Sequence, residues 1–276
     1  MKLSLITATY NCAGTLGDCL ESVASQTHDD IEHWIIDGGS TDGTLALVES
    51  RQQQVAGVVS EPDEGTYDAL NKGLARVTGE VVGLLHADDV LAGPTVLSQV
   101  AAAFEDPAVE AVYGDLVYVA RDDASRVIRH WQAGPFAPER LRWGWMPPHP
   151  TLYLRRSVYE RFGGFDTAYR IAADYDFMLR VLTQLSGQVV YLPQVLVRMR
   201  LGGISNRSIR AILHESHETT APYGPMVSAD LGHSPGKTCP NCPSLSGVHD
   251  PLCLCPVRIR CTTDQLSPIR ITFRLS

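Results

Sequence analysis

The sequence predicts an α/β fold built on a mostly parallel central sheet with helices on both faces. Apolar runs that suit buried strands alternate with stretches of helical periodicity along the first half of the chain. This alternation is typical of a parallel sheet covered on both sides. A polar cluster also follows each of the first four apolar runs, and sheets of this class bind ligands at the carboxyl ends of their strands.

Each expected element follows from its own pattern. Strands are predicted at the apolar runs 3–8, 33–36, 55–59, 81–85 and 111–117. Helices are predicted at the amphipathic stretches 14–25, 44–52, 66–77 and 94–104. Beyond about Arg121 the pattern loosens, and the sequence predicts a long loop, a strand at 151–154, a short helix, a turn at Gly163-Gly164 and a helix over 174–186.

Composition limits the class of protein. A chain of 276 residues with 44% hydrophobic and 20% charged residues suits one sizeable soluble core with an appendage. The formal charge of −8 argues against non-specific binding to nucleic acid, so no nucleic-acid partner is expected. No apolar stretch approaches the ~18 residues of a spanning helix. The first residues resemble a strand and not a secretory signal, so a cytoplasmic location is expected.

The carboxyl-terminal segment 214–276 differs in composition from the rest. It contains 8 of the 17 prolines and 5 of the 7 cysteines, without sustained periodicity. We expect one domain over 1–213 and an irregular tail that is disordered or the product of a shifted reading frame. The tail's cysteines have the spacing of a zinc knuckle, although the second pair is C-x-C, and zinc binding is the less favoured hypothesis.

Two adjacent carboxylates, Asp88 and Asp89, follow the apolar run 81–85. Like charges repel and are costly to desolvate, so the pair needs a compensating partner. The residues alone allow two interpretations, a functional pair or a turn cap with a solvated neighbour. Asp37 ends its own apolar run in the same way, where a carboxylate either accepts a hydrogen bond from a ligand such as a nucleobase or caps a turn.

Other nucleotide-binding patterns are missing. No G-x-G-x-x-G follows the first strand and no P-loop is present, which disfavours those two site classes. An aspartyl-phosphate phosphatase needs a second Asp two residues after the nucleophile, whereas Asp37 is followed by Gly38 and Gly39. The opening stretch ITATYN offers hydroxyls and an amide that suit a base and a ribose, or an ordinary polar turn.

Five segments, taken in order, resemble inverting family 2 glycosyltransferases: ITATYN, IIDGGSTDGT, EPDEGTYDALNKGL, TGEVVGLLHADD and ADYDFMLR. The resemblance covers about residues 1–205. It implies a GT-A-type fold for nucleotide-diphospho-sugar transfer, with the nucleotide in about residues 1–115 and the acceptor in 116–213. It further implies metal-dependent transfer from a donor, with UDP expected, to a glycan or lipid-linked acceptor in cell-surface polysaccharide biosynthesis.

The resemblance also implies the donor site. Asp37 would recognise the base, beside four residues of the first strand end: Thr7, Thr9, Tyr10 and Asn11. Near the diphosphate and sugar it places Asp63, Asp68 and Lys72. Asp89 would be the direct ligand of Mg²⁺ or Mn²⁺, which prefer hard oxygen ligands, and Asp88 would contact the ribose or share the metal. His86 stands where the family often has Asp or Asn.

On the acceptor side the resemblance assigns Asp174 as the base that takes the proton of the attacking hydroxyl. The family has Glu-Asp where this chain has Ala173-Asp174. Trp143, Trp145 and His149 would face the acceptor or simply pack, and Arg200 would close over the diphosphate or end a solvated strand. The alternative function is an inactive nucleotide-sugar sensor or scaffold, which has no need for Asp174. Membrane contact, if made, would be peripheral, at the inner face.

Overall fold

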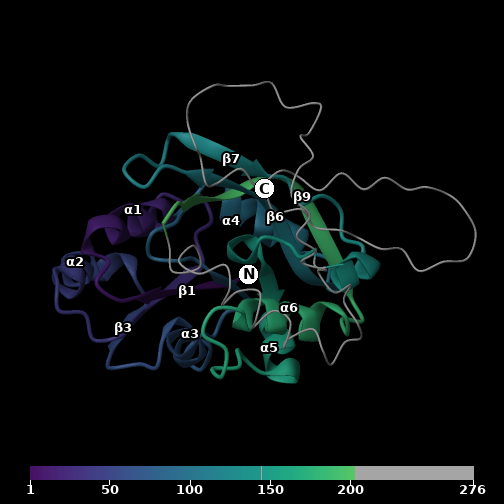
Figure 1. The fold of residues 1–276 in the computed structure, drawn as a ribbon, viewed down its shortest axis with the longest axis horizontal. Coiled ribbons are helices and arrows are strands. Elements are labelled where there is room, and N and C mark those ends of the chain that lie inside the picture. Colours follow the sequence, from purple (N-terminus) through teal and green to yellow (C-terminus); the bar gives the residue numbers. More distant parts are fainter. Residues whose placement is uncertain (144, 203–276) are drawn as a thin grey trace, which may run out of the picture. The chain divides into compact units, whose positions relative to one another are not determined.

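The computed structural model describes residues 1–143 and 145–202. In this part of the chain nine strands form one sheet, in the order β3-β2-β1-β4-β8-β6-β9-β5, with β7 paired to β6 (Figure 1). The expected domain end at residue 213 and the cysteine-containing tail 214–276 lie outside the described residues. None of the helices in the described part is long and apolar enough to cross a lipid bilayer.

The elements have the following bounds. The strands are β1 (Leu3–Thr9), β2 (Ile31–Asp37), β3 (Gly57–Ser60), β4 (Val81–Leu84), β5 (Val90–Leu91), β6 (Val109–Val119), β7 (Val127–Trp131), β8 (Tyr153–Arg155) and β9 (Gln188–Arg200). The helices are α1 (Ala13–Ala24), α2 (Thr44–Ser50), α3 (Thr66–Leu74), α4 (Val96–Ala103), α5 (Arg156–Phe162) and α6 (Ala173–Leu182). Three 3₁₀ turns are η1 (Gln52–Gln54), η2 (Pro138–Trp143) and η3 (His149–Thr151).

The amino-terminal half of the sheet is parallel, as the alternation of strands and helices predicted. β1 pairs in parallel with β2 and β4, and β2 pairs in parallel with β3. Their register aligns Thr9 with Asp37 and Asp37 with Ser60. The polar strand ends therefore share one edge of the sheet, which is the arrangement that positions the site.

The second half of the sheet is mixed and contains three strands that the sequence did not reveal: β5, β7 and β9. β8 runs antiparallel to β4 and β6, whereas β6 and β9 are parallel. The exposed Pro193 interrupts the apolar pattern of β9, and the β6–β9 register shifts beside it. Proline cannot donate to a ladder, so a strand carrying one is hard to identify from pattern alone. The α/β class is confirmed, with the parallel arrangement confined largely to the first half.

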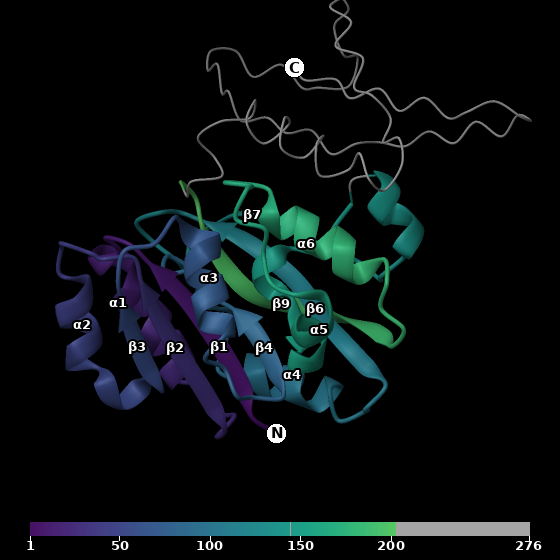
Figure 2. The same cartoon turned by 90° about the horizontal axis from the view of Figure 1, so that it is seen from below.

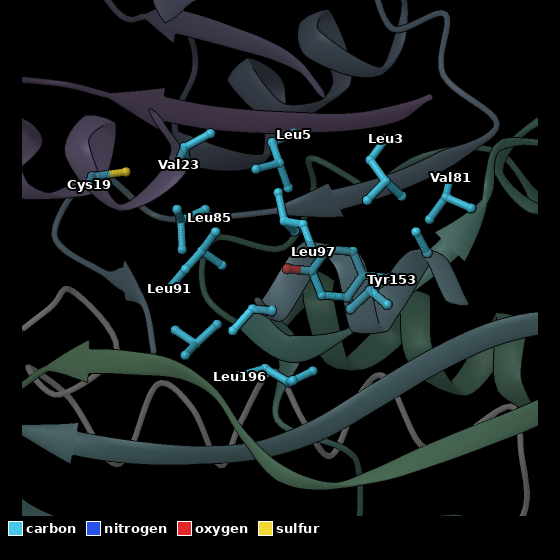
Figure 3. Close-up of a cluster of buried hydrophobic side chains, with 14 of the residues drawn as sticks. Leu3, Leu5, Cys19, Val23, Val81, Leu85, Leu91, Leu97, Tyr153 and Leu196 are labelled. Atoms are coloured by element: carbon cyan, nitrogen blue, oxygen red, sulfur yellow. The ribbon is translucent and has the colours of Figure 1, made fainter. Parts of the chain in front are cut away.

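Helices cover both faces of the sheet. Figures 1 and 2 show α1 and α4 on one face and α3, α5 and α6 on the other. Leu3 and Leu5 of β1 pack with Leu97 of α4 in the main apolar cluster (Figure 3). Ile6 points to the opposite face, where its side chain lies against Gly73 of α3. This two-sided burial explains why β1 is apolar at nearly every position.

Gly83 of β4 provides a stability test of this packing. A Cβ at this position would lie 2.4 Å from Cε1 of the buried Tyr153 ring and 3.1 Å from Leu5 Cδ2. We therefore expect Gly83→Ala to lower the free energy of unfolding by about 1–3 kcal/mol, the usual effect of overpacking a core. Urea denaturation of the folded variant measures this change.

The matched control is Gly14→Ala in helix α1. Apart from its chain neighbours and its own helix backbone, no atom lies within 4 Å of the Cβ that this substitution would add. Alanine is the better helix former, so the free energy of unfolding should rise by roughly 0.5–1 kcal/mol. Equal changes in the two variants would contradict the packing described for β4 and β8.

Candidate active site

Asp37 joins the ends of three parallel strands. Its Oδ1 accepts hydrogen bonds from the hydroxyls of Thr9 (3.1 Å) and Ser40 (2.5 Å). Its Oδ2 accepts from the Ser60 hydroxyl (2.8 Å) and from the backbone N–H groups of Gly39 (3.1 Å) and Ser40 (3.0 Å). Burial alone would raise the pKa of Asp37, but these hydrogen bonds, led by those from Ser40, outweigh it and lower the pKa.

This network changes the interpretation of Asp37. The residue is only 1% exposed, and both carboxylate oxygens are occupied by donors of the protein itself. A nucleobase could reach the Asp37 carboxylate only by displacing one of those donors. The geometry therefore supports the turn-capping alternative for Asp37 and does not support the base contact that the resemblance implied.

Thr7 is a second correction at the first strand end. Its side chain is fully buried, and Oγ1 lies 2.9 Å from Nε2 of the equally interior His33. Side chains alternate along a strand, so Thr7 shares the core-facing side of Leu3 and Leu5. Burial lowers the pKa of His33 to about 4, which leaves this pair uncharged at neutral pH. Thr7 does not reach the site.

The other residues at the end of β1 differ in their burial and in their hydrogen-bond partners. Thr9 is buried, and its hydroxyl donates a hydrogen bond to Asp37. Asn11 adopts a positive φ of 52°, and its side-chain oxygen accepts the N–H groups of Thr41 and Asp42, so it shapes the loop after β2. Tyr10 is 63% exposed. The exposed ring of Tyr10 is accessible to a ligand.

Lys72 of α3 is already paired with acids of the chain. Its ammonium lies 3.1 Å from Oε1 of Glu61 and 3.3 Å from Oδ2 of Asp68, and donates to the Pro62 carbonyl. The Glu61 contact chiefly raises the pKa of Lys72. Lys72 and Asp68 therefore neutralise each other in this structure, and a phosphate would have to compete with both carboxylates for the charge.

The adjacent acids Asp88 and Asp89 have different surroundings. Asp89 is 1% exposed; its Oδ1 accepts the backbone N–H of Arg200 at 3.2 Å, and its Oδ2 has no hydrogen-bond partner among the described residues. Burial first, and then the charge of Asp88, raises the pKa of Asp89 well above its usual range. Asp88 is only partly buried, and its backbone carbonyl accepts from Arg200 Nη1 at 2.9 Å.

Arg200 is buried beneath these acids. Its guanidinium contacts the Asp88 carbonyl and pairs with the Asp18 carboxylate, and the residue is 6% exposed. Both partners belong to the protein, so the structure does not place Arg200 on the acceptor side and leaves it little freedom to close over a diphosphate. The geometry supports a positioning role, in which Arg200 fixes the turn that carries Asp88 and Asp89.

The unsatisfied oxygen of Asp89 tests whether the site suits a cation. A buried carboxylate oxygen without a donor costs free energy, and a divalent cation beside it would remove that cost. No group of three or more His, Cys, Asp or Glu side chains in residues 1–143 and 145–202 is arranged to hold a metal ion. The two carboxylates fit an ion such as Mg²⁺, which commonly takes one or two protein carboxylates and completes its coordination with phosphates and water.

Asp174 lies at the start of helix α6 and is largely buried. Its side chain is 24% exposed, with Oδ2 3.7 Å from Nδ1 of the buried His149. The Tyr67 hydroxyl lies 3.3 Å from Asp174 Oδ1 and also donates to the Ile171 carbonyl at 2.6 Å. Burial raises the pKa of Asp174, which makes this carboxylate a stronger base than an exposed aspartate.

His149 is the neutral neighbour of Asp174. Burial chiefly, and then the nearby His86, lowers the pKa of His149 to about 3. Its ring contacts Phe165 edge-on with centroids 5.7 Å apart, so its orientation is fixed by packing. Trp145 donates its indole N–H to the Ala133 carbonyl and stacks with Arg140, which supports the packing alternative. The side chain of Trp143 lies outside the described residues.

Sequence reasoning missed Tyr67, which lies beside Asp174 although the two residues are 107 positions apart. Asn71, for which a turn or helix-start role was preferred, has a structural contact: its amide donates to the Phe165 carbonyl and accepts the Phe165 N–H. Both residues are within the segment EGTYDALNKGL, so the motif itself was the available signal. Helical spacing of four places the two side chains on one face of α3, toward the loop that leads to α6.

The strand-end acids and Asp174 meet at one edge of the sheet. Burial raises the pKa of the Cys12 thiol, and the charges of Asp88, Asp42 and Asp37 raise it further, which places these acids around the start of α1. His86, two residues before Asp88, has its ring centroid 6.2 Å from that of His149, which contacts Asp174. A molecule lying along this edge could therefore touch both the acid pair and Asp174.

Sequence comparisons agree with this geometry. The family model described as Glycosyl transferase family 2 matches residues 4–166. A PGL/p-HBAD biosynthesis glycosyltransferase of Mycobacterium tuberculosis is 32% identical over 208 residues, covering 74% of this chain and 78% of the relative. An uncharacterized glycosyltransferase of Nostoc is 31% identical over 236 residues, covering 81% of this chain and 72% of the relative.

Solved structures share the fold at low sequence identity. TarS of S. aureus in complex with UDP-GlcNAc has a TM-score of 0.64 at 19% identity, covering 75% of this chain and 61% of the TarS chain. The mannosyltransferase PcManGT of Pyrobaculum calidifontis, in complex with GDP-Man and Mn²⁺, has a TM-score of 0.61 at 21% identity. That match covers 80% of this chain and 64% of PcManGT, so the present chain spans less than two thirds of either protein.

Proposed function

Since the chain belongs to glycosyl transferase family 2 and is a glycosyltransferase, we propose that it transfers a sugar from a nucleoside-diphosphate donor with inversion at the anomeric carbon. The observation that carries the proposal is the position of Asp174. Its carboxylate, with a raised pKa, lies at the same edge of the sheet as the strand-end acids. A nucleotide-binding module has no use for a base at that position.

Asp174 acts as the general base in this proposal. A sugar hydroxyl is a weak nucleophile, and a carboxylate that takes its proton while the new bond forms lowers the barrier. The acceptor oxygen attacks the anomeric carbon, the bond to the donor diphosphate breaks, and the proton goes to Asp174. Attack from the side opposite the leaving diphosphate inverts the anomeric configuration. Tyr67 and the neutral His149 hold the carboxylate in place without protonating it.

Asp88 and Asp89 are the residues that would hold a divalent cation in this proposal. A bound Mg²⁺ or Mn²⁺ would supply positive charge to the departing diphosphate. Arg200 supports the pair from below, because its backbone N–H and guanidinium fix the turn on which both acids stand. Lys72 adds positive charge near the same edge once Asp68 and Glu61 release it.

The donor and acceptor are assigned by class. UDP and GDP sugars are each bound by a structural neighbour, and the proposal favours UDP. The mycobacterial relative is named for the biosynthesis of PGL and p-HBAD, which supports a lipid-linked or glycan acceptor in cell-surface polysaccharide or glycolipid assembly. We place the enzyme in the cytoplasm, with peripheral contact at the inner face of the membrane.

A donor screen tests the proposal. Melting temperature is measured with UDP-sugars and GDP-mannose, with and without Mn²⁺, and donor hydrolysis is measured in parallel. A ligand that binds only the folded state raises the melting temperature by mass action. We expect a rise with one donor class, enhanced by Mn²⁺, together with slow hydrolysis of that donor. Binding without turnover under any condition would favour the alternative, an inactive sensor.

A further inference from the structure

The ring of Phe165 packs against two side chains that contact the Asp174 carboxylate. Its centroid lies 5.7 Å from that of Tyr67 and 5.7 Å from that of His149, which it meets edge-on. The Tyr67 hydroxyl lies 3.3 Å from Asp174 Oδ1, and His149 Nδ1 lies 3.7 Å from Asp174 Oδ2. A single ring therefore supports a neighbour of each carboxylate oxygen.

The same ring packs on the helix that carries Asp174. Phe165 is 5% exposed, and its centroid lies 4.8 Å from that of Phe177 on α6. Asp174 and Phe177 are three positions apart on this helix, so their side chains are neighbours on its surface. Aromatic rings at such separations attract one another beyond the area that they bury. Phe165 thus fixes α6 and the two neighbours of the carboxylate in one cluster.

The backbone of Phe165 is held by Asn71 of α3. The Asn71 amide donates to the Phe165 carbonyl and accepts the Phe165 N–H, both at 2.8 Å. The preceding residue is Gly164, where a Cβ would lie 2.2 Å from Asn71 Oδ1. The absence of a side chain at this position therefore allows the amide to approach the backbone closely.

Arg180 of α6 holds the other part of the same turn. Its guanidinium donates to the carbonyls of Phe162 and Gly164, the second at 2.7 Å. The turn 162–165 is therefore tied to α3 through Asn71 and to α6 through Arg180. A reacting group keeps its geometry when its neighbours are themselves locked by packing and hydrogen bonds. Phe165 is such a neighbour, locked on both counts.

We propose that Phe165, held by Asn71, is a positioning residue for the general base Asp174. Its ring fixes Tyr67 and His149, and these two side chains direct the carboxylate toward the attacking hydroxyl. The inference rests on the proposed function, which makes Asp174 the base. A base displaced by about 1 Å can lose on the order of 10²-fold in rate while substrate binding is retained.

Phe165→Leu tests the assignment, because leucine keeps an apolar side chain but removes the ring. The probe is hydrolysis of UDP-GlcNAc or GDP-mannose, whichever raises the melting temperature in the donor screen, with water as the acceptor. We expect the rate at saturating donor to fall about tenfold or more, while the donor affinity measured by calorimetry stays unchanged.

A pH profile of the same variant separates positioning from general loss of structure. Burial raises the pKa of Asp174, and looser packing around Phe165→Leu admits water to this carboxylate. The pKa of Asp174 should then fall, so the decrease in turnover on acidification should move to lower pH. Asn71→Ala removes the clamp and keeps the ring, and both readouts should move in the same direction. If Phe165→Leu does not fold, Asn71→Ala decides by these two readouts.

The matched control is Tyr159→Leu. Tyr159 is 9% exposed and stacks on Phe177 with centroids 5.2 Å apart, so this substitution also removes a buried ring from the packing of α6. Its turnover and its pH profile should stay close to those of the wild type.

Unchanged turnover and pH profile in folded Phe165→Leu or Asn71→Ala would overturn the inference, and so would equal changes in Tyr159→Leu. Either result leaves the proposed function standing as long as Asp174→Asn is impaired. Wild-type turnover in Asp174→Asn would instead remove the base, and the inference with it.

Discussion

Replacing Asp174 with asparagine is expected to lower kcat by about 10²–10⁴-fold, the usual contribution of a positioned general base. The amide keeps the shape of the side chain and the contacts with Tyr67 and His149, but it cannot take a proton. Donor affinity should stay close to that of the wild type, because the proposal assigns Asp174 to the acceptor side of the site. Transfer rates at saturating donor, with donor affinity from calorimetry, measure the two effects separately.

The matched control for this prediction is Asp176→Asn. Asp176 lies two residues after Asp174 on the first turn of α6, where its Oδ2 lies 3.4 Å from Nη2 of Arg180. It is also an acid of the first turn, but its carboxylate is paired with Arg180, so most of the wild-type turnover should remain. Equal losses in the two variants would show that helix α6, and not the carboxylate of Asp174, was disturbed.

The pH dependence of the same enzyme gives a second readout of Asp174. Burial raises the pKa of this carboxyl, and the base is active only when deprotonated. Turnover should therefore fall on acidification at a pH above the ordinary aspartate value of about 3.9. The residual turnover of Asp174→Asn should not fall over this acidic pH range. If the same fall in turnover persisted in the variant, it would belong to the titration of another group.

The sequence was sufficient to predict the parallel strands, and the helices between them, that carry the strand-end acids. Buried parallel strands are apolar along their whole length, as β1 and β4 show, and the helices between them are amphipathic. The same reasoning failed for β9, because Pro193 and the adjacent register shift break the pattern of a strand that pairs with β6 along most of its length. That strand carries Arg200, so the setting of Asp89 could not be predicted either.

The candidate site was predictable as a set of residues and not as a set of contacts. Polar strand ends indicate which acids lie at one edge of the sheet. They do not show which carboxylate already accepts hydrogen bonds from its own loop. Asp37 and Asp63 illustrate this, since the hydroxyls of Ser40 and Ser60 occupy the buried Asp37 carboxylate. Asp63 is partly exposed and accepts the backbone N–H of Gly65. The prediction for Thr7 was wrong for a related reason, because Thr7 lies two residues before the end of β1 and its side chain is buried with those of Leu3 and Leu5.

The second large effect is expected from Asp88→Asn. Asp88 is the partly exposed member of the pair, so its carboxylate is the one that can approach both a cation and the donor diphosphate. Neutralising it should abolish the Mn²⁺-dependent rise in melting temperature and lower turnover on the order of 10²-fold or more, since a cation stabilises the leaving diphosphate by several kcal/mol. A chelator should reproduce the loss of turnover in the wild type.

Asp89→Asn distinguishes metal binding from simple structural damage. Without a cation, burial and then the charge of Asp88 raise the pKa of Asp89, so its charged form is disfavoured. An amide at this position is therefore expected to leave the melting temperature of the metal-free protein unchanged or higher. With Mn²⁺ present the wild type gains stability and this variant does not. If Mn²⁺ stabilised both variants as much as the wild type, the two acids would have no part in holding the ion, and their adjacency would reflect only the turn that Arg200 fixes.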